Sequence, residues 1–510
     1  MHRALFLPEI VATILETERS SPGFLHTCLF VSKIFSEEAC RILWYSCGAY
    51  CFAEQGTPNI RHLAQIAIQN TERAQYYADF IHVLEFSEEE SEEENEGEEN
   101  WVGDEADHDE ARWHKELTSL QFPQLKDFSL HESSNATELN TGEFISHYAQ
   151  PNIESFTVYQ GSRISDALFD KLTQSCPRLK SLHLSKIRAS NLSKDGLVRF
   201  LNRTDALTAL VIQTGVYDSW SYEAFEAIAK LPNLTYIEIP DIQDNWVKSV
   251  YQANTSTPLF PKLDVHLSAG ISERDLECLA HHVPKLEDLS ITLQNMPPSL
   301  SILASASNFS HLTNLKVEFG PRNRISGSDL LLLARNCPLL SSLSLGVVDD
   351  DAFSPPGPAS RPSTTGITDD VIDEVAQALG DSIISLRIIF DRSDLLTWSS
   401  ILSLAQYCQN LGDLTISCNF DWQEAMSGTF EHTFPALENL DLVFDSILRE
   451  SQVANYDEAM IQSCAQNMFE LAPKLSLIWI DGANEGDDCW KSTVQKIYYD
   501  NLSFLEAEED

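Results

Sequence analysis

Residues 164–184 read ISDALFDKLTQSCPRLKSLHL, and this stretch predicts the fold. Its first half has an apolar residue at every fourth position, the spacing of one helix face: Leu168, Leu172 and Cys176. Pro177 then ends the helix, because proline cannot continue the backbone hydrogen bonding. Leu182 and Leu184 alternate with polar residues, as in a short strand with one buried face. The stretch therefore predicts a unit of helix, turn and strand.

The same unit recurs along most of the chain. Its pattern Pro-x-Leu-x-x-Leu-x-Leu reappears, for example, as LPNLTYIEI from Leu231 and CPLLSSLSL from Cys337. The first apolar position of each copy gives 13 anchors: Leu125, Ile153, Leu179, Leu207, Leu234, Leu263, Leu286, Leu312, Leu340, Ile383, Leu411, Leu437 and Leu475. Ten of the twelve spacings between successive anchors lie between 23 and 29 residues. Such a period predicts stacked repeats that share one core.

Parallel strands joined by helices place the helices outside. We therefore expect an α/β fold, a curved right-handed solenoid with its strands on the concave face. Several predicted helices begin with residues that commonly cap a helix N-terminus. These are Ser272 with Asp275, Ser326 with Asp329, and Thr368 before two aspartates. One copy, FPKLDVHLS from Phe260, looks one residue short between its apolar positions.

The repeat phrase resembles the cysteine-containing leucine-rich repeat. The resemblance rests on the pattern I-S/T-x-x-x-L…LA-x-x-C-P-x-L-x-x-L-x-L and covers roughly residues 115–480. Cys176, Cys337 and Cys408 each stand three residues before an anchor. We interpret them as small buried packing residues. The resemblance implies a leucine-rich-repeat solenoid.

The N-terminal segment has a different pattern. Leu7, Ile10, Val11, Ile14 and Leu15 form a helical stripe with Pro8 in the first turn. A second apolar face follows, at Phe24, Leu25, Cys28 and Leu29. Ser36 is expected to cap a third helix whose apolar residues are Ala39, Ile42, Leu43 and Trp44. Three such short helices need a further surface on which to pack.

This segment resembles the F-box in its fungal form. The match is LPEIVATIL from Leu7 and LFVSKIFSEEACRILW from Leu29. F-box proteins dock on the Skp adaptor of cullin-based ubiquitin ligases, so the resemblance implies Skp and cullin as partners. It assigns adaptor binding to these positions: Leu7, Pro8, Ile10, Leu29, Val31, Ser32, Phe35, Leu43 and Trp44. The last two are expected to anchor the third helix.

These patterns divide the chain into five parts. They are an F-box-like domain (1–50), a helical linker with an initial repeat (51–86), a disordered acidic insertion (87–112), a solenoid of about 13 repeats (113–480, with a loop at 349–366) and a C-terminal cap with an acidic tail (481–510). Fourteen acidic residues lie between Glu88 and Glu110, and too few apolar residues accompany them to stabilise a fold.

Composition excludes several classes of function. The net charge of −43 repels phosphate backbones, which disfavours nucleic-acid binding and favours basic partners. The eleven cysteines show no zinc spacing or disulfide pattern, which is typical of the cytoplasm or nucleus. No apolar run reaches the length of a membrane span. Phosphate-binding loops, nucleophile elbows and zinc-protease motifs are missing from the sequence, so we expect neither catalysis nor a cofactor or metal.

Strand alternation predicts which residues face a partner. The residue between the last two buried positions of each strand should point outward. The set is Ser129, Thr157, His183, Val211, Glu238, Ser290, Lys316, Ser344, Arg387, Thr415, Asp441 and Trp479. We single out His183, Glu238, Lys316, Arg387, Asp441 and Trp479 as candidate substrate contacts, with His183 and Trp479 as hot spots by residue type.

The leading hypothesis is a substrate-recognition adaptor of an SCF-type cullin ubiquitin ligase. Its F-box would bind the Skp adaptor, and its concave face would bind an unknown protein substrate. Two alternatives remain open: an acidic repeat scaffold or chaperone for basic proteins, and a repeat-based activator of GTPases.

Overall fold

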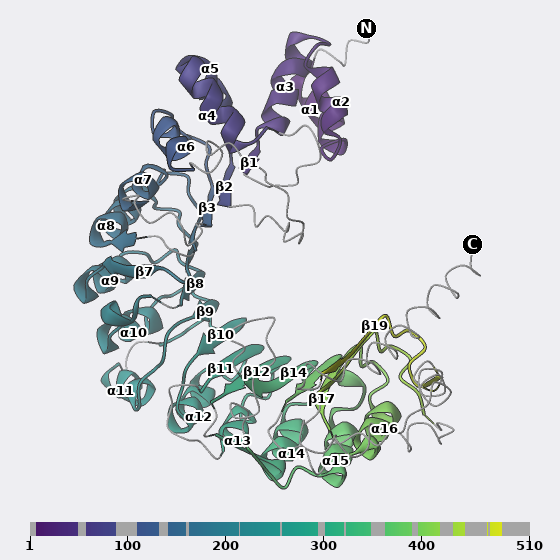
Figure 1. The fold of residues 1–510 in the computed structure, drawn as a ribbon. Helices are drawn as coiled ribbons and strands as arrows, with labels where there is room; N and C mark the ends of the chain where they lie inside the picture. The colour runs from purple at the N-terminus through teal and green to yellow at the C-terminus, as the bar shows by residue number, and fades with distance from the viewer. Residues whose placement is uncertain are drawn as a thin grey trace, which may run out of the picture. The chain divides into compact units, whose positions relative to one another are not determined.

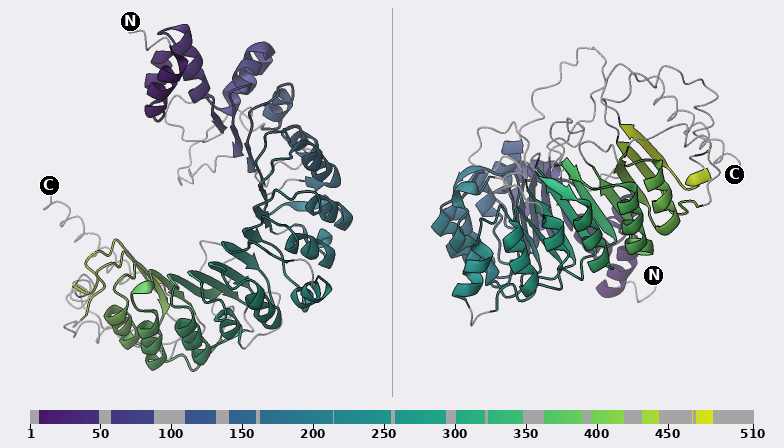
Figure 2. Two further views of the ribbon diagram at one scale, coloured as in Figure 1. Left: turned by 180° about the vertical axis from the view of Figure 1, so that it is seen from behind. Right: turned by 90° about the horizontal axis from the view of Figure 1, so that it is seen from below.

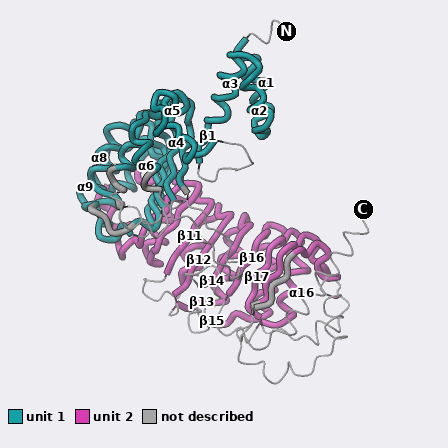
Figure 3. The backbone as a smooth tube through the Cα atoms, turned by 45° about the horizontal axis from the view of Figure 1, so that its top comes forward, with its two compact units in different colours: residues 1–234 teal, residues 235–510 magenta. Residues whose placement is uncertain are grey.

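The computed structural model confirms an α/β architecture of parallel strands connected by helices. It describes residues 7–48, 58–87, 110–131, 141–159, 163–213, 215–254, 258–293, 301–320, 323–347, 363–389, 396–418, 432–443, 467 and 470–481. The chain forms two compact units, Met1–Leu234 and Thr235–Asp510, which Figure 3 draws in different colours. Most of the acidic insertion, the loop at 349–362 and the C-terminal cap lie outside the described residues.

The first unit begins with helices and continues into the repeats (Figure 1). Its helices are α1 (Pro8–Thr17), α2 (Pro22–Cys28), α3 (Lys33–Leu43), α4 (Ile60–Gln69), α5 (Thr71–Ala78), α6 (Glu110–Leu117), α7 (Thr141–His147), α8 (Asp166–Ser175), α9 (Lys194–Leu201) and α10 (Tyr222–Ala229). Its main strands are β1 (Ser46–Gly48), β2 (Val83–Ser87), β3 (Asp127–His131), β4 (Ser155–Val158), β6 (Ser181–Leu184) and β8 (Ala209–Ile212). These strands pair in parallel in that order. A separate pair joins β5 (Arg163–Ser165) to β7 (Arg188–Asn191).

The second unit repeats the same alternation. Its helices are α11 (Trp246–Ala253), α12 (Glu273–His282), α13 (Ile302–Ala306), α14 (Gly327–Asn336), α15 (Asp369–Leu379) and α16 (Trp398–Tyr407). Its main strands are β9 (Tyr236–Glu238), β10 (His266–Ala269), β11 (Asp288–Thr292), β12 (Asn314–Phe319), β14 (Ser342–Val347), β16 (Ser385–Ile388), β17 (Asp413–Ser417), β18 (Asn439–Val443) and β19 (Leu477–Asp481). They also pair in parallel in this order. Neighbouring helices pack side by side from α11 to α16, along one face of the sheet (Figure 2).

The anchor residues form the core of both units. All 13 predicted anchors are buried. Cys176, Cys337 and Cys408 are buried at the ends of α8, α14 and α16, and their thiols donate to backbone carbonyls of the preceding repeat. Burial raises the pKa of each thiol to about 12. This confirms their interpretation as packing residues, since a thiol with so high a pKa is unreactive.

The copy at Phe260 is longer than predicted. Leu267 pairs with Ile237 and Leu289, so it is the first buried strand residue of this repeat. It follows its anchor Leu263 by four positions, whereas Leu289 follows Leu286 by three. Val265 is therefore an extra residue, and it is exposed to solvent. The prediction of a missing residue was wrong because the neighbouring strands determine the register.

Three further local predictions were wrong. Ser32, not Ser36, caps α3, and its hydroxyl accepts a hydrogen bond from the backbone N–H of Phe35. Ser326 ends the short strand β13 (Arg324–Ser326) at the N-cap position of α14, but its hydroxyl contacts the Ser328 hydroxyl at 2.7 Å and caps no backbone N–H. The end of the predicted 349–366 loop forms β15 (Ser363–Thr365), which pairs with β13. Ser272 and Thr368 do cap α12 and α15 as predicted.

Carboxylates join successive helices. Asp369, the first residue of α15, accepts hydrogen bonds from the backbone N–H and the hydroxyl of Thr397 at 2.9 and 2.8 Å, and from the hydroxyl of Ser400. Thr397 is the N-cap of α16, so one carboxylate satisfies donors of the next repeat. Asp166 at the start of α8 holds Ser193, the N-cap of α9, in the same way.

Replacing Asp369 by alanine is expected to destabilise the second unit by roughly 1–3 kcal/mol, because donors at the start of α16 lose their acceptor. Urea unfolding followed by circular dichroism measures this loss. Asp370→Ala is the matched control, since Asp370 is the exposed neighbour in the same helical turn. Equal losses in both variants would contradict a specific role for Asp369.

Candidate functional site

Helix α1 has one buried and one exposed apolar face. Pro8 occupies the first turn, where its missing N–H leaves no helix hydrogen bond unmade. Val11 and Leu15 are fully buried, and α1 packs against α3. Ile10, which is 40% exposed, and Ile14 lie on the other face. The apolar residues predicted as one stripe of α1 therefore lie partly in the core between the helices and partly in solvent.

Helix α2 and the turn after it also carry exposed apolar side chains. Leu25 and Cys28 are buried, whereas Phe24 on the same helix is exposed. In the turn before α3, Phe30 is 88% exposed and Val31 is 46% exposed. We call the exposed apolar residues of this region the helical apolar surface: Leu7, Ile10, Ile14, Phe24, Phe30 and Val31.

The concentration of this surface is unusual. Among the described residues, 14 large hydrophobic side chains are exposed, and six of them lie within residues 7–31. Isolated exposed apolar residues are ordinary, but a group of them commonly marks a binding site. Lys33 and Glu37, which form an exposed ion pair 3.6 Å apart, lie in α3 directly after this group of residues in the sequence.

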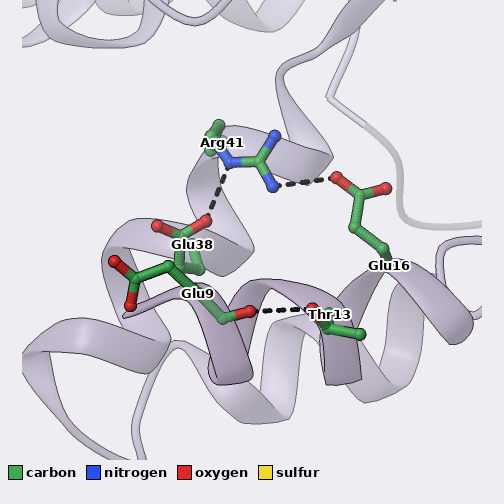
Figure 4. A network of polar contacts seen from close by, with 5 residues as sticks. All are labelled: Glu9, Thr13, Glu16, Glu38 and Arg41. Atoms are coloured by element: carbon green, nitrogen blue, oxygen red, sulfur yellow. Dashed lines mark hydrogen bonds and ion pairs between the residues drawn. The ribbon is translucent and has the colours of Figure 1, made fainter. Parts of the chain in front are cut away.

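Buried residues and one arginine hold the three helices together. Phe35, Ala39 and Leu43 of α3 are buried, and α2 also packs on α3. Arg41 of α3 donates to Glu16 of α1 and to Glu38, both at 2.8 Å (Figure 4). The arginine therefore ties α1 to α3 while the helical apolar surface stays open to solvent.

Trp44 joins the helices to the rest of the first unit. Its side chain is 7% exposed and stacks on Tyr77 of α5, with ring centroids 4.7 Å apart. Tyr45 stacks on His82 at 4.6 Å, and the Arg19 guanidinium lies 4.5 Å from the Tyr45 ring. Strand β1 follows at once, so the sheet begins inside the segment 1–50. The Trp44 side chain is thus buried by contacts within the chain.

The nine predicted adaptor contacts fall into three groups. Leu7, Pro8, Ile10 and Val31 are exposed. Leu29 and Ser32 are half-buried, and Phe35, Leu43 and Trp44 are buried. The prediction did not include Ile14, Phe24 and Phe30, although Phe30 lies within the motif itself and Ile14 continues the spacing of Leu7 and Ile10.

The predicted outward row exists in each unit as a line of paired residues. In the first unit, the row runs across neighbouring strands through Glu85, Ser129, Thr157, His183 and Val211. In the second unit it runs through Glu238, Ser268, Ser290, Lys316, Ser344, Arg387, Thr415, Asp441 and Trp479. Val211 differs from the rest of its row because it is buried.

The second unit's face carries mixed charges. Lys316 forms an ion pair with Glu318 at 2.6 Å. His266 lies 3.2 Å from Asp288 and 3.8 Å from Glu238, and its ring stacks on Tyr236. The described part of the chain contains no group of three or more side chains placed to hold a metal ion. Within the same residues, no helix is long and apolar enough to cross a bilayer.

Comparisons with known proteins assign no family. No protein-family model and no curated protein matches the chain. Among solved structures, the chain is similar to the yeast complex of Rad7 and Elc1, with a TM-score of 0.38 and 14% sequence identity. The match covers 89% of this chain and 90% of that chain. A likeness at this level defines neither a fold nor a function.

Proposed function

We propose that the chain is a substrate-recognition adaptor of an SCF-type cullin ubiquitin ligase. The helical apolar surface binds a Skp-type adaptor, which connects the chain to the cullin scaffold. A strand face of the repeats holds the protein substrate. The chain acts by proximity in the cytoplasm or nucleus, and it supplies no catalytic side chain and no cofactor.

The observation that carries this proposal is the helical apolar surface. It occupies the segment that resembles the F-box, and it includes Leu7, Ile10 and Val31 from the predicted docking set. These side chains are exposed although the helices beside them have a well-buried second face. Burial of such a surface by a partner removes apolar area from water, which drives association.

Purification of the full-length chain with a recombinant Skp adaptor tests the proposal. A stable complex, which then recruits the cullin scaffold, is the expected result. A folded chain that captures no Skp adaptor at micromolar concentrations would overturn the ligase role.

The net charge favours a second candidate, an acidic scaffold or chaperone for basic proteins. This role predicts partner binding that survives deletion of residues 1–48 and disappears at moderate salt. The adaptor role predicts instead that this deletion abolishes Skp capture.

A further inference from the structure

Three aromatic rings lie next to one another on the strand face of the first unit. His131 ends β3, Tyr159 follows β4, and His183 lies on β6. The rings of His131 and Tyr159 stack with centroids 4.1 Å apart, and those of Tyr159 and His183 are 4.6 Å apart. We call these three residues the ring ladder. Each is only half-buried, so a partner can reach it.

Hydrogen bonds hold the ladder in place. The Ser129 hydroxyl lies 2.9 Å from Nε2 of His131, and the Tyr159 hydroxyl lies 3.4 Å from Nδ1 of His183. The backbone N–H of Tyr159 donates to the carbonyl of Leu130, which continues the pairing of β3 and β4. The rings are therefore positioned before any partner arrives, which limits the entropy that binding must overcome.

The charge beside the ladder is negative. Glu85 of β2 lies on the same face, with its carboxylate 4.0 Å from Nε2 of His131, and Asp127 of β3 lies two residues before Ser129. None of the described strand positions on this face of the first unit is a lysine or arginine, and Lys126, the residue before β3, is the cation that acts on Asp127. The second unit differs, because its strand face carries Lys316 and Arg387. A cationic partner is thus favoured on the first unit's face.

The imidazole of His131 does not repel a cation by charge. Burial lowers the pKa of this histidine, and the neighbouring Glu85 carboxylate opposes that shift only in part. The ring is therefore mostly neutral at neutral pH. A neutral aromatic ring beside a carboxylate suits a guanidinium, which is planar, stacks on rings and donates several N–H groups to carboxylate oxygens.

We propose that the ring ladder, together with Glu85, binds an arginine-bearing segment of a partner protein. This inference rests on the proposed adaptor function, for which it names the substrate class: proteins with an arginine-rich segment. An anionic peptide would be repelled by Glu85 and Asp127. An apolar peptide would desolvate both carboxylates without giving them a hydrogen bond.

The test measures binding of a fluorescein-labelled Arg/Gly/Ser peptide to the full-length chain by anisotropy. Peptides with lysine or glutamate in place of arginine serve as comparisons. We expect the arginine peptide to bind best, the lysine peptide more weakly because it lacks a planar group, and the glutamate peptide not at all. Equal binding of the arginine and lysine peptides would contradict the stacking of a guanidinium on the ring ladder.

Variants locate the site. The double variant His131→Ala/Tyr159→Ala and the single variant Glu85→Gln should each weaken binding roughly fivefold or more. Tyr159→Phe keeps the ring and loses only the 3.4 Å contact with His183, so it should bind more tightly than the double alanine variant. Glu287→Gln is the matched charge control, because Glu287 is an exposed carboxylate of the second unit. Equal weakening by Glu85→Gln and Glu287→Gln would show diffuse attraction by the net charge and overturn the site.

Skp capture measured on the same preparations separates this inference from the proposed function. Thermal unfolding confirms that each variant is folded. Arginine-peptide binding that depends on the ladder, in a chain that captures no Skp adaptor, would support the site and overturn the ligase role. Skp capture without ladder-dependent peptide binding would overturn the site and leave the adaptor role standing.

Discussion

Replacing Ile10 and Val31 by aspartate is expected to abolish Skp capture without unfolding the chain. Both side chains are exposed; Ile10 lies on α1 and Val31 in the turn before α3, so the double variant changes the helical apolar surface at two separate segments. Interface hot spots commonly contribute about 2 kcal/mol or more each, and a buried unpaired carboxylate adds a further penalty. The affinity should therefore fall by roughly a thousandfold.

Titration calorimetry of the purified variant against the Skp adaptor measures this loss. The matched control is Ile68→Asp on α4, where an isoleucine that is 50% exposed, against 40% for Ile10, lies outside the helical apolar surface. Unfolding midpoints of both variants should stay close to that of the wild type, because neither substitution removes a buried side chain. Full Skp affinity in the double variant would exclude the helical apolar surface as the docking site.

Replacing Trp44 by alanine is expected to destabilise the first unit by about 3–5 kcal/mol. The ring is buried, and it fills the contact between the end of α3 and Tyr77 of α5. Its loss leaves a cavity as well as removing apolar area from the core. The Tyr77 hydroxyl also accepts hydrogen bonds from the Arg73 guanidinium, so a displaced ring weakens a second interaction on α5.

Chemical denaturation followed by circular dichroism quantifies this effect. Phe24→Ala is the control, since Phe24 is an exposed aromatic residue of the same three helices and its removal should change stability little. A Trp44→Ala variant with unchanged stability but lost Skp binding would make Trp44 a partner contact. That outcome would favour the role inferred from the F-box resemblance over the packing described above.

Much of the repeat architecture was predictable because its determinants are local. A helix-spaced apolar triplet, a proline and two alternating leucines recur within about 27 residues, and stacking buries each copy against its neighbours. Alternation also predicted the outward rows, because successive side chains of a strand point to opposite faces. His183, Lys316 and Arg387 occupy these rows as expected.

Local sequence patterns gave wrong predictions at two places where the chain pairs with another strand. Ser326 and Asp329 match a capping box, but the Ser326 side chain makes no cap to α14, and its backbone lies in a strand beside Thr365, 39 residues further along the chain. In the copy at Phe260, pairing with β9 and β11 placed Leu267 in the core and left Val265 exposed. Pairing with neighbouring strands outweighed the apolar character of Val265.

The sequence by itself determined the helix–strand repeat, its anchors and the alternation of its strand faces. Only the tertiary structure decided which apolar residues of the N-terminal helices stay exposed. The sequence analysis assigned docking to Trp44 and not to Phe30, yet Tyr77 covers Trp44 while Phe30 remains in solvent. Burial depends on which elements meet, and α5 reaches α3 only through the fold of the intervening chain.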